Sequence, residues 1–220
     1  MGAIATLFDF IINIDKYLTL IVNKFGVLTY FILFLIIFFE TGVVIAPFLP
    51  GDSLLFVAGA LAATGTLNVF VLFICLAIAS VLGDTLNYWL GNYFGDRISK
   101  SKWVKKEYIN KTNDFFDKHG GKTIIFARFI PIIRTFAPFV AGVADMSYKK
   151  FISFNIIGGI LWVAIFLLGG FFFGTLPVVQ HNLALFILII IFLSLLPPIL
   201  EFLRQKYYKS KSRRVPKETI

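Results

Sequence analysis

The sequence predicts an all-α integral membrane protein: a polytopic helical bundle with two re-entrant, broken-helix hairpins of opposite orientation. Three observations support this fold class. Of the 220 residues, 58% are hydrophobic and only 15% are charged, and the mean hydropathy is +0.85. Such a composition is typical of membrane-embedded chains rather than of soluble domains. The apolar stretches are broken by proline, glycine and charged residues, and two of the broken stretches share a sequence pattern.

The basic residues are unevenly distributed, and this sets the expected orientation. The formal net charge is +9, and of 21 lysines and arginines eight lie in residues 97–122 and seven in the tail 204–220. Cytoplasmic loops of membrane proteins carry such an excess, so we expect both segments, and with them the C-terminus, in the cytoplasm. Nucleic-acid binding is the competing explanation. The hydropathy of the rest of the chain disfavours it, and we expect no nucleic-acid partner.

Residues 1–24 are expected to form an amphipathic helix in the membrane interface. The apolar sequence between residues 4 and 24 is interrupted at helical spacing by Asp9, Asn13, Lys16, Asn23 and Lys24. Polar residues at this spacing lie along one face of a helix, which suits a helix in the plane of the membrane surface. A short first transmembrane span is the alternative.

Residues 25–203 are expected to form the transmembrane domain. Its continuous apolar runs are Phe25–Phe39, Val69–Gly91, Phe151–Leu176 and Leu183–Leu203. Two further segments, about 40–62 and 123–147, contain prolines and charges that prevent a continuous spanning helix. Lys122 and Lys150 flank the second of these and are both expected in the cytoplasm. That segment must therefore enter and leave the membrane on the same side.

The two broken segments resemble each other. Pro47 is followed by Phe56-Val57-Ala58-Gly59, and Pro131 is followed by Phe139-Val140-Ala141-Gly142. We expect the first hairpin to return to the outer face and the second to the cytoplasm, which makes the pair an inverted repeat. Paired broken helices in opposed halves of a membrane protein indicate a binding site near the midplane, as in transporters.

Four charged residues are expected at membrane depth: Glu40 and Asp52 in the first hairpin, Arg128 and Arg134 in the second. An arginine at the bilayer centre costs roughly 2.5–3.5 kcal/mol on insertion scales, so its presence indicates a function. The planar guanidinium suits phosphate, and carboxylates in a water-poor site can carry protons near neutral pH. We predict a phosphate clamp of the two arginines and a proton-coupling pair of the two acids. The alternative is that the four charges only pair and hold the hairpins together.

Further residues complete the candidate site. Pro131 and Pro138 break the second hairpin, and the helix N-termini that they create would add partial positive charge for an anion. Together with Gly51 they are assigned to substrate binding. Asp84 and Asp145 are secondary candidates nearer the interface, balanced between helix capping and gating.

The sequence shows no pattern typical of an enzyme. Cys75 is the single cysteine, and no metal-ligand spacing, nucleophile elbow or phosphate-binding glycine loop is present. We therefore expect no catalytic residues, no metal and no cofactor.

At these residues the chain closely resembles the bacterial DedA family, which shares a domain with SNARE-associated Golgi proteins and vacuole-membrane proteins of eukaryotes. The motifs that carry the resemblance are, in order, Glu40-Thr41-Gly42, Pro47-Phe48-Leu49-Pro50-Gly51-Asp52-Ser53-Leu54-Leu55, Gly83-Asp84 with Tyr88 and Gly91, Lys118-His119-Gly120-Gly121, and Arg128-Phe129-Ile130-Pro131-Ile132-Ile133-Arg134 with Pro138 and Ala141-Gly142.

The resemblance implies a multi-pass protein of the bacterial cytoplasmic (inner) membrane that translocates lipids and depends on the proton-motive force. By position, Glu40, Asp52, Arg128 and Arg134 match the family's essential membrane-embedded charges. We expect a flippase that returns a phosphate-bearing lipid, undecaprenyl phosphate first of all, to the cytoplasmic leaflet. Its partners would be that lipid, protons and the bilayer, and a homo-oligomer is an open alternative to a monomer. The rival functions are a phosphatidylethanolamine or general phospholipid flippase or scramblase and, from another class, a membrane lipid phosphatase.

Overall fold

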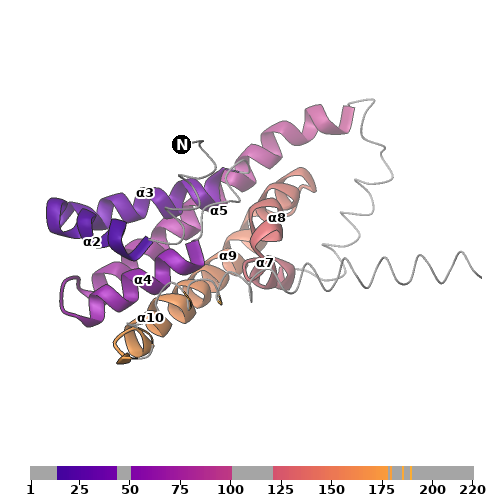
Figure 1. Ribbon diagram of the computed structural model, residues 1–220. Helices are drawn as coiled ribbons and strands as arrows, with labels where there is room; N and C mark the ends of the chain where they lie inside the picture. The colour runs from indigo at the N-terminus through magenta and orange to yellow at the C-terminus, as the bar shows by residue number, and fades with distance from the viewer. Residues whose placement is uncertain are drawn as a thin grey trace, which may run out of the picture.

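The computed structural model describes residues 14–43, 51–100 and 121–177, with isolated positions at 179, 185 and 189, and these residues form helices and turns. Two long helical stretches dominate (Figure 1). One is α5 (Val69–Lys100), and the other is the run of α9 (Tyr148–Val163), η1 (Ala164–Leu168) and α10 (Gly169–Phe173). Within them Val69–Gly95 and Tyr148–Phe173 are long and apolar enough to cross a membrane.

Shorter helices surround this pair. They are α2 (Ile14–Phe25), α3 (Leu28–Gly42), α4 (Gly51–Ala63), α7 (Lys122–Ala127) and α8 (Pro131–Val143). α3 ends at Gly42, followed by the extended residue Val43, and α4 is described from Gly51; residues 44–50, which hold the prolines of the predicted break, lie outside the described residues. The expected span Leu183–Leu203 and the basic tail lie outside the described residues, apart from two helical positions.

The N-terminal helix α2 is amphipathic over its described length. Leu18 and Val22 are buried, whereas Lys16 and Lys24 are exposed. Gly26, with a φ of +52°, turns the chain from α2 into α3. The placement of this helix in the membrane interface stays a prediction.

The two long helices run antiparallel. In the C-terminal half of α5, the ring of Tyr88 stacks on that of Phe151 with centroids 4.4 Å apart. One turn further along α9, Asn155 donates a hydrogen bond of 3.0 Å to the carbonyl of Val81. Since a step forward along α9 is a step backward along α5, the first turns of α9 lie beside the C-terminal half of α5.

The α7 limb of the second hairpin follows α9 in the same direction. Gly121 leaves no room for a Cβ because the ring of Phe154 lies against it, and a Cβ on Gly158 would lie 3.3 Å from the Cα of Ile125. The two contacts are four residues apart on both helices. The limb therefore starts at the same end of the molecule as α9 and reaches the middle of the long helices.

The α8 limb returns along α5. A Cβ on Gly91 would lie 3.0 Å from the Cα of Phe139, and one on Gly95 would lie 3.2 Å from the Cα of Val143. Again both contacts advance by four residues together. The α7–α8 pair thus starts and ends at one end of the long helices, with its turn beside their middle.

The first hairpin repeats this arrangement from the opposite end. Its α3 limb runs parallel to α5. The thiol of Cys75 donates a hydrogen bond of 3.5 Å to the backbone carbonyl of Tyr30. A Cβ on Gly42 would lie 3.2 Å from the carbonyl oxygen of Gly83. From the first contact to the second, the chain advances twelve residues along α3 and eight along α5. The two helices therefore run in the same direction, from the start of α5 to its middle.

The α4 limb returns along the second long stretch. A Cβ on Gly170 would lie 2.9 Å from the Cα of Phe56, and one on Gly174 would lie 2.8 Å from the Cα of Ala60. The spacing of four residues on each helix is the one found between α8 and α5. Gly170 and Gly174 thus allow α4 and α10 to pack closely.

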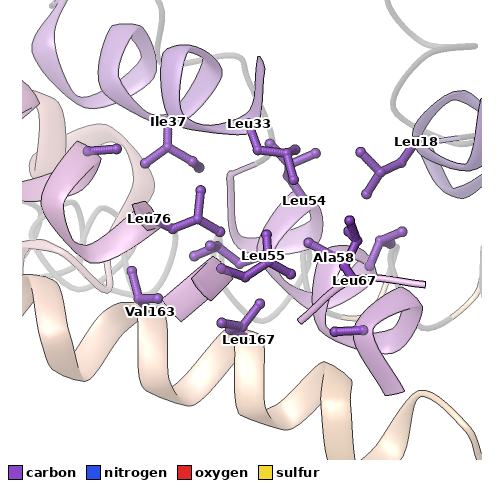
Figure 2. Packing of buried hydrophobic residues seen from close by; sticks show 14 of the residues in the cluster. Leu18, Leu33, Ile37, Leu54, Leu55, Ala58, Leu67, Leu76, Val163 and Leu167 are labelled. Carbon is purple, nitrogen blue, oxygen red and sulfur yellow. The ribbon is translucent and has the colours of Figure 1, made fainter. Parts of the chain in front are cut away.

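Two apolar clusters form the buried core of the described residues. The larger one joins α2, α3 and α4 to α5 and the α9–η1 region; Figure 2 shows Leu33, Leu55 and Leu167 converging in it. The second joins α5, α7, α8 and α9 around Tyr88 and Phe151. Polar side chains occupy the zone between the two clusters.

Candidate functional site

Arg134 on α8 connects the two hairpins. Its Nη1 donates a 2.7 Å hydrogen bond to Oδ1 of Asp52 on α4, and its Nη2 bonds to Oε1 of Glu40 on α3. All three side chains are buried. The planar fork of the guanidinium allows one arginine to hold two carboxylates that come from different helices. The structure therefore brings together three of the four predicted charges.

Trp162 of α9 closes this group from the side of the second long helix. The indole Nε1 donates a 2.8 Å hydrogen bond to Oδ1 of Asp52, and the Cζ of Arg134 lies 4.9 Å from the ring centroid. An arginine over a desolvated tryptophan face is attracted by roughly 2 kcal/mol. The candidate site read from the sequence did not include Trp162, because an uncharged tryptophan in an apolar span carries no signal of this contact.

Gly51 is the first residue of α4 and lies against Glu40. Its backbone N–H donates a 3.1 Å hydrogen bond to Oε1 of Glu40, and a Cβ at this position would collide with the carboxylate. A carboxylate on the first N–H groups of a helix is stabilised by the positive end of the helix dipole. Among the described residues, Gly51 thus positions the carboxylate of Glu40. The predicted role of Gly51 was instead a contact with the substrate.

Arg128 is held by a separate set of side chains. Its Nη2 lies 2.5 Å from Oδ2 of Asp84 and bonds to Oδ1 of Asn155, and its Nη1 lies 2.5 Å from Oγ of Ser80. Asp84, Asn155 and Ser80 are all buried. Asp84 was a secondary candidate expected nearer the interface; the structure buries its carboxylate and pairs it with Arg128, while its depth in the membrane stays a prediction.

The formal charge of the buried site therefore differs from the predicted value. The four predicted charges sum to zero, but Asp84 adds a third carboxylate to two arginines. The five buried groups among the described residues sum to −1. All five groups are buried, where charges are screened much less than at a solvent-exposed surface, so we treat the two ion groups as one electrostatic unit.

Regular spacing along the long helices places these polar groups. Ser80, Asp84 and Asn87 follow one another at intervals of four and three residues, and so share one face of α5. Asn87 donates hydrogen bonds of 3.3 and 2.6 Å to the carbonyls of Thr41 and Thr135, and thereby ties both hairpins to α5. A polar stripe at helical spacing inside an apolar span was the sequence signal that could have found these residues.

Pro131 and Pro138 have different effects on the second hairpin. Ile130 is extended and α8 begins at Pro131, as the fixed φ of proline favours at the first helical position. Pro138, in contrast, lies inside α8, which continues through it to Val143. The expected second helix N-terminus at Pro138 was therefore wrong. Its missing N–H only leaves the carbonyl of Arg134 without an intrahelical donor.

Asp145 lies apart from the buried charges and ends α8. Asp145 is exposed and has a φ of +52°. Its N–H donates a 3.2 Å hydrogen bond to the carbonyl of Gly142, and the N–H of Met146 donates a 3.1 Å hydrogen bond to the carbonyl of Ala141. These bonds define a Schellman motif, in which a left-handed residue satisfies the last carbonyls. Asn92 of α5 donates a 3.0 Å bond to its carboxylate. Of the two alternatives, the structure supports helix capping, and gating stays a prediction.

The fold and the buried charges together describe a helical protein with two apolar helices long enough to cross a membrane and an ionic site between these and the shorter helices. Comparison with known proteins identifies the group. Residues 49–172 match the VTT domain, and the chain belongs to this family, the DedA family. The resemblance seen in the sequence is thereby confirmed.

The curated relatives agree along most of the chain. Protein DedA of Escherichia coli (strain K12) is 53% identical over 211 residues, which cover 94% of this chain and 96% of that protein. A membrane protein of Mycobacterium leprae (strain TN) is 44% identical over 186 residues, 83% and 82% of the two chains. Inner membrane protein YqjA of Escherichia coli (strain K12) is 36% identical over 152 residues, 68% and 69%. No solved structure matches the chain. The protein is a membrane protein of this family.

Proposed function

We propose that the protein is a proton-coupled flippase for a phosphate-bearing lipid, with undecaprenyl phosphate as its first candidate substrate. The observation that carries the proposal is the buried network of Arg128 and Arg134 with three carboxylates. A buried ion pair stabilises a fold little after desolvation. Five such groups in one small membrane protein therefore suit a site whose charges are exchanged for those of a ligand.

The helix arrangement supports a transport role. The limbs α3 and α4 extend from one end of the long helices to their middle, and the limbs α7 and α8 do so from the opposite end. In a membrane this arrangement would make the pairs α3–α4 and α7–α8 re-entrant hairpins. The equal contacts of Phe56 with Gly170 and of Phe139 with Gly91 suit two halves related as an inverted repeat. Transporters of that design place their substrate site at the midplane.

Protons enter the proposal through Glu40 and Asp52. Both acids pair with Arg134, and the three side chains together carry a formal charge of −1. A phosphate that approaches them adds further negative charge. Uptake of a proton by one of the carboxylates would offset that charge. We assign the two acids to proton coupling for this reason.

The test uses the purified protein in liposomes that carry fluorescent undecaprenyl phosphate. The expected result is movement of the label between leaflets without release of inorganic phosphate, with a rate that rises when a proton gradient is imposed. Empty liposomes and an Arg128→Ala, Arg134→Ala double variant serve as controls. Phosphate release in step with loss of the lipid would instead establish a phosphatase, and equal rates in protein and control vesicles would exclude translocation.

One observation favours a second lipid. The Oε2 atom of Glu40 is buried and has no hydrogen-bond partner among the described residues. It could accept a hydrogen bond from the ammonium group of phosphatidylethanolamine while an arginine binds the phosphate of the same lipid. The same liposome assay with labelled phosphatidylethanolamine and, as a matched lipid without the ammonium, phosphatidic acid distinguishes the two candidates.

A further inference from the structure

The two arginines of the site have different surroundings. Arg134 lies between two carboxylates, those of Glu40 and Asp52, so its group carries a formal charge of −1. Arg128 has one carboxylate, Asp84, and two neutral partners, so its group is formally neutral. An incoming anion is therefore repelled more strongly at Arg134 than at Arg128.

The neutral partners of Arg128 also suit an anion. The hydroxyl of Ser80 can rotate and donate to a phosphate oxygen, which a carboxylate cannot do. Two glycines of α9 let that helix pack directly against this group: a Cβ on Gly158 would lie 3.0 Å from the Cδ of Arg128, and one on Gly159 would lie 3.1 Å from the Oγ of Ser80. The Nε atoms of both arginines are buried and have no hydrogen-bond partner among the described residues, so this donor does not distinguish Arg128 from Arg134. Asp84 contacts the guanidinium of Arg128 as an ion pair, and its Oδ2 atom likewise has no hydrogen-bond partner among the described residues.

We propose that Arg128, rather than Arg134, is the ligand of the lipid phosphate, and that Asp84 holds the place of that phosphate while the site is empty. Carboxylate and phosphate engage the guanidinium fork with the same geometry. The phosphate displaces Asp84 from Arg128, and Asp84 thereby sets how tightly the anion binds. The inference rests on the proposed phosphate-lipid function and identifies which arginine serves it.

The test measures binding of farnesyl phosphate to the purified full-length protein in detergent by titration calorimetry, with farnesol as the control without phosphate. Asp84→Asn keeps the size of the side chain and its contact with Arg128 but removes the competing charge. We expect its Kd for farnesyl phosphate to fall by about tenfold or more, since a charge-assisted bond no longer has to be broken. The matched variant Asp52→Asn, which relieves Arg134 instead, should lower the Kd by less than Asp84→Asn does, because Asp52 contacts Arg134 and Asp84 contacts Arg128.

Ser80→Ala provides a second variant that leaves every charge in place. It should weaken binding of farnesyl phosphate by about threefold or more, because one hydrogen bond to the phosphate is lost, with farnesol unaffected. A Kd unchanged in Asp84→Asn and in Ser80→Ala, or a larger gain in Asp52→Asn, would overturn the assignment to Arg128 while leaving phosphate binding in place. Equal affinity of the wild-type protein for farnesyl phosphate and farnesol would overturn the proposed function itself, and the assignment with it.

Discussion

At the scale of single residues, the geometry at position 134 requires arginine rather than positive charge alone. Two terminal nitrogens of Arg134 serve two carboxylates on different helices, and the flat face of the group lies over Trp162. Lysine carries the same charge at a single point and cannot make these contacts together.

We predict that Arg134→Lys inserts into the membrane but loses most lipid transport. A hydrogen bond to a charged group contributes about 1.5–3 kcal/mol, so loss of one should lower transport by about 10- to 100-fold. The liposome assay measures this effect after the amount of folded protein is matched. Lys150→Arg, an exchange on the exposed first turn of α9, is the control and should transport normally. Transport by Arg134→Lys within about twofold of wild type would mean that the residue is only a counter-charge.

Sequence reasoning found the charges of the site but only part of their pairing. Glu40, Arg128 and Arg134 are conspicuous because a charge in an apolar run is costly. Asp84 and Trp162 are less conspicuous in the sequence. An acid near the end of an expected span is commonly a helix cap, and an aromatic residue within a span commonly serves packing. Their part in the site depends on which residues face each other across α5 and α9, and that register follows from packing in three dimensions.

At the scale of helices, the hairpins are held by backbone contacts at glycine. Gly170 lies against the backbone of Phe56, and Gly91 lies against that of Phe139. The Phe-Val-Ala-Gly repeat in the sequence thus corresponds to a repeated crossing of helices. The same sequence gave no basis for the continuation of α8 through Pro138, because helix packing around a proline decides whether the helix breaks or continues.

We predict opposite effects of alanine at two adjacent glycines of α10. Gly170→Ala places a methyl group into the backbone of α4 and should destabilise the protein by about 1–3 kcal/mol. Gly169→Ala meets nothing within 4 Å and should stabilise it by up to about 1 kcal/mol through helix propensity. Thermal unfolding in detergent, followed by circular dichroism, compares the two. Equal melting temperatures would contradict the close crossing of α4 and α10.

At the scale of the whole molecule, the buried charges link transport to pH. Five ionisable groups from both hairpins and α5 form one unit, and its formal charge of −1 becomes more negative when a phosphate enters. We expect proton uptake to accompany lipid binding, so that affinity falls as the medium becomes alkaline. Glu40→Gln and Asp52→Asn mimic the protonated acids and should bind the phosphate lipid with a flatter pH profile. The measurement is lipid binding and flipping between mildly acidic and alkaline pH. Wild-type profiles in both variants would move the coupling to Asp84 or Asp145.

The orientation of the hairpins in the membrane is the remaining property of the whole molecule. Fold and lysine distribution agree that the α7–α8 pair begins and ends at one end of the long helices, the end expected in the cytoplasm. Cysteines at Lys122 and Lys150, both exposed, should therefore react with a membrane-impermeant maleimide only from the cytoplasmic side, and a cysteine at Thr66, in the exposed turn between α4 and α5, only from outside. Gly121 is unsuitable for a label, because Phe154 fills the space that a side chain would need. The native Cys75 is first replaced by alanine so that it does not react. Labelling of Lys122→Cys and Lys150→Cys from opposite sides would make the α7–α8 segment a membrane span, and the two arginines would then lie on a crossing helix rather than at the turn of a hairpin.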